Sequence, residues 1–355
     1  MLPELARQRI GFYVSHMDVA VRAQRLAKNY LRPKRREGPW AGLRSFFSFQ
    51  REAVAAVREV DFTIRRGEAV GFIGENGAGK STTIKMLTGL LLPSSGSVET
   101  LGMDPWHERR RLATNIGVVF GQKPQLLWDI PAAQSFELLK AMYAIPEDTY
   151  RFTLRETVER LELGELLKKP VRLLSLGQRM RCDLAASLLH APAVAFLDEP
   201  TIGMDVLVKE RVRELLVEMR RRFGMTVLLT THDLKDISTT CQRLLVLDKG
   251  RLLYDGDMAG FERRFAGQRV ARVELSREPE RAALATLQSA LAELEANLTE
   301  EGPRVLRIVC SRPGTAARVT ALVLQQVEVE DLSVQGTDIE ALVANVYRDG
   351  ATHAV

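Results

Sequence analysis

Short apolar runs and helical stripes alternate along most of this chain. Continuous apolar runs at Ala69 to Ile73, Val194 to Leu197 and Thr226 to Thr231 predict buried strands of a parallel sheet. Between the last two runs, apolar residues instead recur every three or four positions, which predicts an amphipathic helix. This stripe consists of Val208, Val212, Leu215, Leu216, Met219 and Phe223. Strands that alternate with helices predict an α/β fold.

Two parts of the chain depart from this alternation. Pro124 to about His190 is mainly helical by its periodicity, and the residues after Phe265 predict a small α+β unit. The predicted helices of the first part are Ala133 to Ala144, Thr149 to Leu161 and Arg179 to Leu189. The α+β unit is predicted as strand Arg269 to Leu275, helix Pro279 to Ala296, strand Arg304 to Cys310, helix Thr315 to Gln325, strand Val327 to Ser333 and helix Asp338 to Tyr347. A hairpin around Lys249 and Gly250 is predicted ahead of this unit.

The first apolar run leads into a glycine-rich segment that fits G-x-x-x-x-G-K-[ST], with a predicted helix after it. The segment consists of Gly74, Glu75, Asn76, Gly77, Ala78, Gly79, Lys80 and Ser81, followed by Thr82. Its glycines let backbone N–H groups approach phosphates, and the helix start adds the positive end of a dipole. A glycine-rich turn that binds nothing is the alternative, but the flanking strand and helix favour a phosphate-binding loop.

The side chains at the end of this loop have chemical roles in that interpretation. Lys80 would reach the β- and γ-phosphates of a nucleotide as a point charge. The Ser81 hydroxyl would ligate Mg²⁺, which takes few protein ligands and keeps several waters. Thr82 would support the α-phosphate side. ATP and Mg²⁺ are therefore the expected cofactors.

Polar residues follow the other two apolar runs. Asp198 and Glu199 end the second run, and His232 ends the third, where open α/β sheets bind their ligands. We expect Asp198 to hold Mg²⁺ through water, and Glu199, on the opposite side of the strand, to act as general base toward the attacking water. His232 is expected to hydrogen-bond the γ-phosphate or to orient that water. A solvated strand end is the alternative for the two carboxylates, and the phosphate loop disfavours it.

With Leu174-Ser175-Leu176-Gly177-Gln178 placed between the phosphate loop and Asp198, the order of motifs resembles the nucleotide-binding subunit of an ABC transporter. The resemblance runs from about Val19 to about Phe265. It implies a P-loop NTPase of the ABC ATPase type, an α/β fold with a RecA-like core, an antiparallel β subdomain around the base and a helical subdomain. It also implies an enzyme that hydrolyses ATP to ADP and phosphate.

The resemblance assigns roles to three further residues. Gln122 matches the glutamine loop, which senses Mg²⁺ and couples to the membrane partner. Asp205 lies in the loop that is expected at the subunit contact. Tyr30 matches the aromatic residue that stacks on adenine, although the interval from Tyr30 to the phosphate loop exceeds the usual one. The alternatives for the adenine platform are Phe46, Phe47 and Phe49.

Leu174 to Gln178 matches the family signature, Leu-Ser-Gly-Gly-Gln, except that Leu176 replaces the first glycine. The expected contacts to a γ-phosphate are the Ser175 hydroxyl, the Gly177 N–H and the helix start near Gln178, and all three remain. A Ser175 N-cap in front of an amphipathic helix is the alternative. By family logic the signature closes over ATP held by another subunit. The resemblance therefore implies a homodimer, or a pair of such ATPases, that encloses two ATP molecules.

The expected domain organisation is an N-terminal extension over residues 1–18, a nucleotide-binding domain over 19–265 and a C-terminal α+β accessory domain over 266–355. The nucleotide-binding domain would contain the helical subdomain at about 124–190 and a basic insert at 32–52. The apolar residues of this insert are Trp40, Leu43, Phe46, Phe47 and Phe49. A membrane-facing or partner-facing segment and an ordinary packed loop are its two main interpretations, and nucleic-acid contact ranks behind both.

Composition limits the possible environments. The chain has 46% hydrophobic residues and a formal charge of +5, with its basic residues mostly dispersed. It lacks a run near the roughly 18–20 uninterrupted apolar residues that cross a bilayer, and its start lacks a secretory signal pattern. Cys182, Cys241 and Cys310 are too scattered for a disulfide framework or a zinc site. With the resemblance, these features predict a cytoplasmic protein, peripheral on the inner face of the membrane through a separate polytopic permease.

Within the family, three segments look most like bacterial ATPases of the ABC-2 type, in the drug- and viologen-exporter-like branch. They are Gly117 to Gln122, Leu127 to Pro131 and Leu197 to Asp205. The expected function is an ATPase that dimerises on ATP and drives such an exporter through a separate membrane subunit. The alternatives are a polysaccharide-exporter ATPase and a non-transport ABC ATPase acting on nucleic acid or ribosomes. One phosphate loop and the lack of sustained heptads disfavour the non-transport class.

Overall fold

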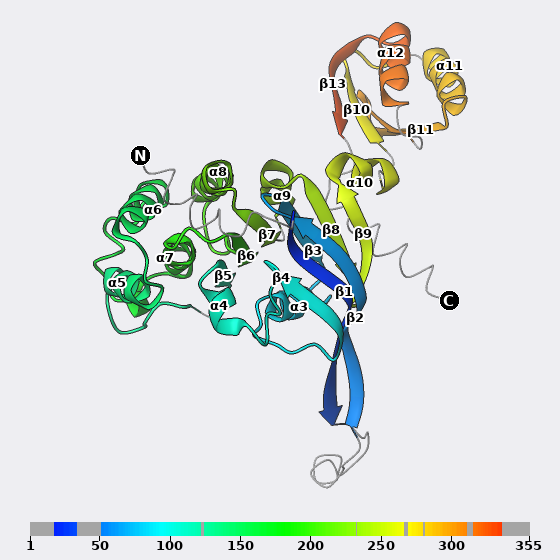
Figure 1. Cartoon of the computed structure of the whole chain (residues 1–355). Coiled ribbons are helices and arrows are strands. Elements are labelled where there is room, and N and C mark those ends of the chain that lie inside the picture. The colour runs from blue at the N-terminus through cyan, green and yellow to red at the C-terminus, as the bar shows by residue number, and fades with distance from the viewer. Residues whose placement is uncertain are drawn as a thin grey trace, which may run out of the picture. The chain divides into compact units, whose positions relative to one another are not determined.

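The chain folds into two compact units with the division between Gly256 and Asp257 (Figure 1). The computed structural model describes residues 18–33, 51–121, 124–231, 233–265, 269–279, 281–310 and 315–335. The sequence predicts a domain boundary after Phe265, and the second unit also includes α10 (Met258–Phe265), a helix that precedes this boundary. The first unit holds a six-stranded and a three-stranded sheet, and the second a four-stranded sheet.

The six-stranded sheet has the strand order β5-β6-β7-β3-β8-β9. Its strands are β3 (Ala69–Gly74), β5 (Ile116–Phe120), β6 (Val194–Asp198), β7 (Thr226–Thr230), β8 (Arg243–Asp248) and β9 (Arg251–Asp257). Neighbouring strands from β5 to β8 are parallel. Both faces of such a sheet are covered, so β3, β6 and β7 are buried along their whole length, as their apolar runs predicted. The predicted hairpin joins β8 to β9, and Lys249 and Gly250 both have the positive φ of a type I′ turn.

The three-stranded sheet is antiparallel and has the order β2-β1-β4. Its strands are β1 (Val19–Pro33), β2 (Arg51–Arg65) and β4 (Ser95–Thr100). β1 and β2 pair along their whole length, whereas β4 pairs only as far as Ala27 of β1. The expected antiparallel region is therefore one long hairpin whose outer part extends past β4. Most of the predicted insert, including the candidate adenine platforms Phe46, Phe47 and Phe49, lies outside the described residues.

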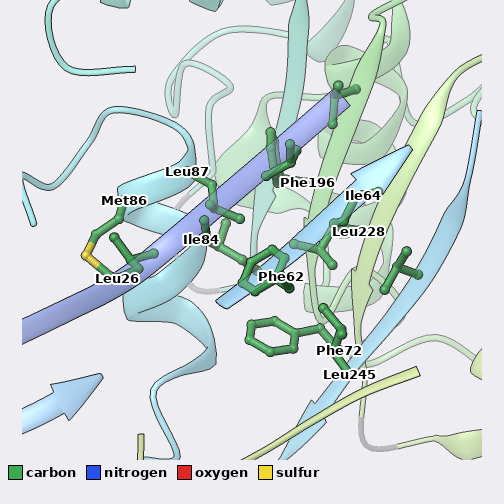
Figure 2. Packing of buried hydrophobic residues seen from close by; sticks show 14 of the residues in the cluster. Leu26, Phe62, Ile64, Phe72, Ile84, Met86, Leu87, Phe196, Leu228 and Leu245 are labelled. Atoms are coloured by element: carbon green, nitrogen blue, oxygen red, sulfur yellow. The ribbon is translucent and has the colours of Figure 1, made fainter. Parts of the chain in front are cut away.

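The main hydrophobic core joins the two sheets of the first unit to α3 (Lys80–Leu87). Figure 2 shows the cluster formed by Leu26, Phe62, Ile64, Phe72, Ile84, Met86, Leu87, Phe196, Leu228 and Leu245. Phe62 of β2 and Phe72 of β3 bring their ring centroids to 6.4 Å. Burial of this apolar surface is the main favourable term in folding, and it fixes the phosphate loop between β3 and α3.

The remaining helices of the first unit are α4 (Arg109–Ala113), α5 (Ala132–Met142), α6 (Glu147–Arg160), α7 (Leu176–Leu188), α8 (Val206–Phe223) and α9 (Leu234–Thr240). The helices α5 to α8 follow predicted segments with shifted ends, whereas α4 and α9 correspond to no helix that the sequence analysis named. α7 begins three residues before the predicted Arg179, because Ser175 caps it. α8 buries most of the predicted stripe and ends at Gly224, whose φ is 65°. Over the stretches that the structure describes, none of the helices combines the length and apolarity of a membrane span.

The second unit has the element order βαββαβ after α10. Its elements are β10 (Arg269–Leu275), α11 (Arg281–Ala292), β11 (Ala296–Gly302), β12 (Val305–Cys310), α12 (Ala316–Gln326) and β13 (Val329–Gln335). All pairs in the order β11-β12-β10-β13 are antiparallel, which is the ferredoxin-like arrangement. The predicted helix to Ala296 was too long, because the chain turns at Glu295 (φ 53°) and continues as β11. The predicted helix Asp338 to Tyr347 lies outside the described residues.

Candidate active site

The glycine-rich segment connects β3 to α3 and packs tightly against neighbouring strands. A Cβ atom on Gly74 would lie 2.4 Å from the Leu247 carbonyl oxygen, and one on Gly79 would lie 2.4 Å from the Ala56 carbonyl oxygen. Gly79 has φ 108° and precedes α3 without any side-chain cap. The first N–H groups of a helix lack intrahelical acceptors, so the uncapped start of α3 offers its donors to a bound anion.

Lys80 places a buried positive charge in this loop. Lys80 is only 6% exposed, and its Nζ donates hydrogen bonds to the carbonyl oxygens of Gly74 at 2.5 Å and Glu75 at 3.1 Å. Burial lowers the pKa of Lys80, while the nearby carboxylates of Glu199 and Asp198 oppose this shift. A cation desolvated beside an uncapped helix start suits phosphate groups, so this loop fits the expected nucleotide.

The ends of β6 and β7 are joined through Thr230, which sequence reasoning did not single out. Thr230 Oγ1 donates to Asp198 Oδ1 at 2.6 Å. The Glu199 N–H donates to the carbonyl oxygen and to Oγ1 of Thr230, both at 3.1 Å. Glu199 has φ 53°, so the chain leaves the extended conformation there and the expected strand alternation does not set its direction. Such left-handed conformations of non-glycine residues store strain and concentrate at functional sites.

Two predicted site residues, Gln122 and His232, lie outside the described residues. Their neighbours show which strand ends they follow. The Gly121 N–H donates to the Asp198 carbonyl oxygen at 3.1 Å, and Thr231 follows β7 beside β6. The carboxyl ends of parallel strands meet at one edge of a sheet. The strands that lead to Gln122, Asp198 and His232 and into the phosphate loop therefore end at the same edge.

The oxygen atoms expected to hold Mg²⁺ come from this edge. Ser81 lies in the first turn of α3 and Asp198 ends β6, and α3 contacts β6. Hydroxyl and carboxylate oxygens are ligands that Mg²⁺ accepts, and the second carboxylate, Glu199, adds negative charge. The residue types and their placement therefore fit the ion, with Gln122 as a predicted third ligand.

The signature segment caps its own helix. Ser175 Oγ accepts the Gln178 N–H at 3.3 Å, and Gln178 Oε1 accepts the Ser175 N–H at 3.0 Å, which is a capping box. The helix therefore begins at Leu176 and not near Gln178 as expected. The cap uses an acceptor lone pair of Ser175 and leaves its hydroxyl proton available to a phosphate. A Cβ atom on Gly177 would lie 2.2 Å from the Gly203 carbonyl oxygen, so only glycine fits there.

The last two candidate residues have local roles that their sequence context did not reveal. Asp205 is the N-cap of α8, and its Oδ1 accepts the Val208 N–H at 2.9 Å. Tyr30 is 37% exposed and pairs with Val54 across the hairpin. Val54 lies two residues from Ala56, whose carbonyl oxygen faces Gly79 of the phosphate loop. This placement keeps Tyr30 available as the adenine platform.

Asp183, on the signature helix α7, is a second residue that sequence reasoning missed. Its Oδ1 accepts the Gln125 N–H at 3.1 Å, and the Gln125 side chain donates back to the Asp183 carbonyl oxygen at 2.9 Å. Burial raises the pKa of Asp183 to about 7. The pair ties α7 to the segment just after Gln122, a contact between residues far apart in the sequence that no local pattern indicates.

Comparison with known proteins agrees with this geometry. Residues 57–202 match the family model described as ABC transporter. The chain is 30% identical over 284 residues to the uncharacterized ABC transporter ATP-binding protein YcbN of Bacillus subtilis, which covers 80% of this chain and 89% of that protein. This chain belongs to the ABC transporter ATP-binding proteins. It is therefore an ABC ATPase, which binds and hydrolyses ATP, and the expected P-loop fold is confirmed.

Solved ABC ATPase structures share the fold of this chain. One similar structure is the dimeric, post-hydrolysis ATP-binding cassette MJ0796 bound to ADP and Pi, at 26% identity and a TM-score of 0.55. That alignment covers 67% of this chain and 98% of the cassette. Another is cbiO1 from Clostridium perfringens, part of the transporter complex cbiONQ, at 30% identity, a TM-score of 0.53, and coverage of 68% and 89%.

Proposed function

We propose that this ABC ATPase closes as a dimer over two ATP molecules and drives an ABC-2 type exporter through a separate polytopic membrane subunit. The observation that carries the proposal is the arrangement of the phosphate loop, the ends of β6 and β7, and the signature within one unit. These are the parts that an ATP-dependent dimer needs. The chemistry, the dimer and the membrane partner have separate support.

In the chemical step, Lys80 and the N–H groups at the start of α3 would bind the phosphates, and Ser81, Asp198 and Gln122 would hold Mg²⁺. When bound, the ion supplies positive charge to the β- and γ-phosphates. Glu199 would accept a proton from the attacking water as general base. Thr230 supports this role, because it fixes the Glu199 backbone and the Asp198 carboxylate together.

Exposed apolar residues beside the signature support the dimer. Leu176 is 42% exposed and packs on Gly203, and Val206 and Leu207 are each 69% exposed at the start of α8. Ile202, next to Gly203, is also exposed. Contiguous apolar residues on a surface mark contact sites, and Asp205 was predicted in the same loop. The substitution of Leu for Gly at position 176 would add apolar contact at this interface.

Relatives with named export roles support the direction of transport. The chain is 34% identical to the Nod factor export ATP-binding protein I of Ralstonia nicotianae, which covers 61% of this chain and 65% of that protein. It is 35% identical to the daunorubicin resistance ATP-binding protein DrrA3 of Streptomyces coeruleorubidus, with coverage of 61% and 67%. Both agree with the exporter resemblance of residues 117–122, 127–131 and 197–205.

The segment tied to α7 by Asp183 offers a surface for the membrane subunit. Leu127 and Trp128, two and three residues after Gln125, are each 48% exposed, and Leu138 and Met142 are exposed one turn apart on α5. The Leu127 N–H donates to Ser135 Oγ at 3.1 Å, which places this segment beside the start of α5. We propose this surface as the contact through which movement of the glutamine loop reaches the permease.

The test is affinity purification of tagged Glu199→Gln protein from mildly solubilised membranes in ATP. This variant should hold the closed dimer and retain one polytopic membrane protein. Adding that membrane protein to the wild-type chain should then raise the ATPase rate of the wild-type chain. Lys80→Ala, which removes the phosphate-binding charge, is the matched control and should lose ATP-dependent retention. Recovery of ribosomes or nucleic acid without a membrane protein would instead support the non-transport class.

A further inference from the structure

A buried carboxylate outside the phosphate loop joins two segments that carry catalytic candidates. Asp236 lies on α9, four residues after His232 in the sequence, and its side chain is 1% exposed. It accepts hydrogen bonds from Thr201 Oγ1 at 2.8 Å and Thr231 Oγ1 at 3.3 Å, and it pairs with Arg213 Nη1 at 2.7 Å. A buried charge is tolerated only when it is paired and hydrogen-bonded, so these three partners are held in a defined arrangement.

The two threonines come from the neighbouring strand ends. Thr201 is the second residue after Glu199 and begins the loop that runs to Asp205, whereas Thr231 directly precedes His232. Both are buried, at 5% and 6% exposure, so their hydroxyl groups depend on protein partners more than on water for hydrogen bonds. The loop after Glu199 and the end of β7 therefore share one hydrogen-bond acceptor, the Asp236 carboxylate.

Helix α8 attaches the far end of the same loop to α9. Lys209 and Arg213 lie one turn apart on one face of α8, which starts at its N-cap Asp205. Lys209 Nζ contacts Asp233 Oδ2 at 2.8 Å, and this pairing lowers the pKa of Asp233. Asp233 directly follows His232 and caps α9. The loop from Thr201 to Asp205 is thus held to α9 at its beginning by Asp236 and at its end through α8.

We propose that Asp236 is a positioning residue that makes the loop after Glu199 and the segment from Thr231 to the start of α9 move as one unit during ATP hydrolysis. The proposal rests on the roles proposed above for Glu199 and His232. His232 is the residue proposed to contact the γ-phosphate. Loss of that phosphate would then also move the loop from Thr201 to Asp205, which carries the predicted subunit contact. Asp236 acts on the two segments through Thr201 and Thr231, while its pair with Arg213 holds the carboxylate in place.

The test is a double-mutant cycle with Thr201→Val and Thr231→Val, which keep side-chain shape and remove each hydroxyl group. We expect each single variant to lower kcat by roughly tenfold with little change in KM for ATP. The double variant should lose no more than Thr231→Val alone, still about tenfold, because both hydroxyl groups donate to one carboxylate. The bond that Thr231 Oγ1 accepts from the Asp233 N–H at 2.9 Å is already lost in that single variant. Thr157→Val is the matched control, since this buried threonine bonds helix carbonyls of α6, and its kcat should equal that of the wild type.

Hydrogen exchange on the nucleotide-free chain provides a second measurement that needs neither turnover nor a membrane partner. Thr201→Val should speed backbone exchange both at 199–205 and at 231–236, and Thr231→Val should do the same. The proposal is overturned if the single variants keep wild-type kcat, if the double variant loses more than about thirtyfold in kcat, or if faster exchange is confined to the mutated loop. Failure of the exporter proposal would leave these exchange results unchanged.

Discussion

The two units of this chain bury different kinds of side chain. The first unit buries Lys80, Asp183, Asp198, Arg213, Asp236 and Asp248 among its apolar residues. In the described part of the second unit, every buried side chain is apolar or cysteine. Burying charge is unfavourable unless partners compensate for it, so the first unit is organised around polar contacts that packing alone would not require. The comparison separates a unit built for chemistry from one built by hydrophobic packing.

Their sheets differ in the same way. The buried strands of the first unit are parallel and end at one edge, where Asp198, Thr230 and the phosphate loop meet. The sheet of the second unit is antiparallel, with buried and more exposed residues alternating along β12. Its charged face carries Arg272 and Arg307, both paired with Glu301 near the surface. Such exposed pairs contribute little stability.

The largest expected effect is on ATPase turnover, which should depend on a carboxylate of the first unit and not on one of the second unit. Glu199→Gln should lower kcat by about 10²- to 10⁴-fold, because it removes the proposed general base while the phosphate loop stays intact. ATP binding, measured by fluorescence with a nucleotide analogue, should be retained. The same substitution at Glu300 on β11, which is exposed, should leave kcat unchanged. Full turnover by Glu199→Gln would remove this residue from the base role.

The second largest expected effect is on stability: breaking a buried ion pair of the first unit should cost more unfolding free energy than breaking an exposed pair of the second unit. Arg213→Met leaves the Asp236 carboxylate buried without its cation, so the free energy of unfolding of the first unit should fall by about 3–5 kcal/mol. Arg307→Met, which breaks an exposed pair of the second unit, should change stability by less than about 1 kcal/mol. Urea denaturation followed by circular dichroism measures both. Equal losses in the two variants would contradict the contrast.

Packing alone should support the second unit. Leu287 on α11 is fully buried, so Leu287→Ala should destabilise this unit by about 2–5 kcal/mol through lost burial and the resulting cavity. The ATPase rate of the purified chain should stay at the wild-type value at temperatures where the second unit remains folded. A parallel fall in kcat there would show that the second unit contributes to catalysis.

The smallest expected effect is a pH dependence from Asp183. Burial raises its pKa to about 7, above the ordinary value of 3.8, so the folded state binds a proton that the unfolded state has lost. Stability from this proton is present below pH 4 and is lost as the pH rises toward 7. Relative to Asp183→Asn, the wild type should therefore lose on the order of 1–3 kcal/mol between pH 4 and 7. A constant difference across that range would contradict the assignment.

Local patterns were enough to predict the parts of the site that depend on local structure. The strand, loop and helix around Lys80 are adjacent in sequence, and the apolar runs before Asp198 and Thr231 fix where β6 and β7 end. The resemblance supplied the order of motifs and the family. The roles that it assigns to Tyr30, Gln122 and Asp205 remain predictions, as does the role that the strand end assigns to His232.

Contacts between distant segments could not be predicted in this way. The Arg213 to Asp236 pair joins α8 to α9, and the Asp183 to Gln125 pair joins α7 to the glutamine-loop segment. Neither pair has a sequence spacing or a local motif from which the contact could be predicted. β11 was missed because Ala296 to Gly302 is polar and lacks alternation, and its extended conformation depends on pairing with β12 at the sheet edge.

If ATP bound at the edge of the first sheet closes two copies of this chain, the mass of the protein in solution depends on the nucleotide. Size-exclusion chromatography with light scattering on the full-length Glu199→Gln variant tests it most directly. We expect the mass of two chains in ATP and of one chain in ADP. A single-chain mass in both nucleotides, or a two-chain mass in both, would contradict closure by ATP.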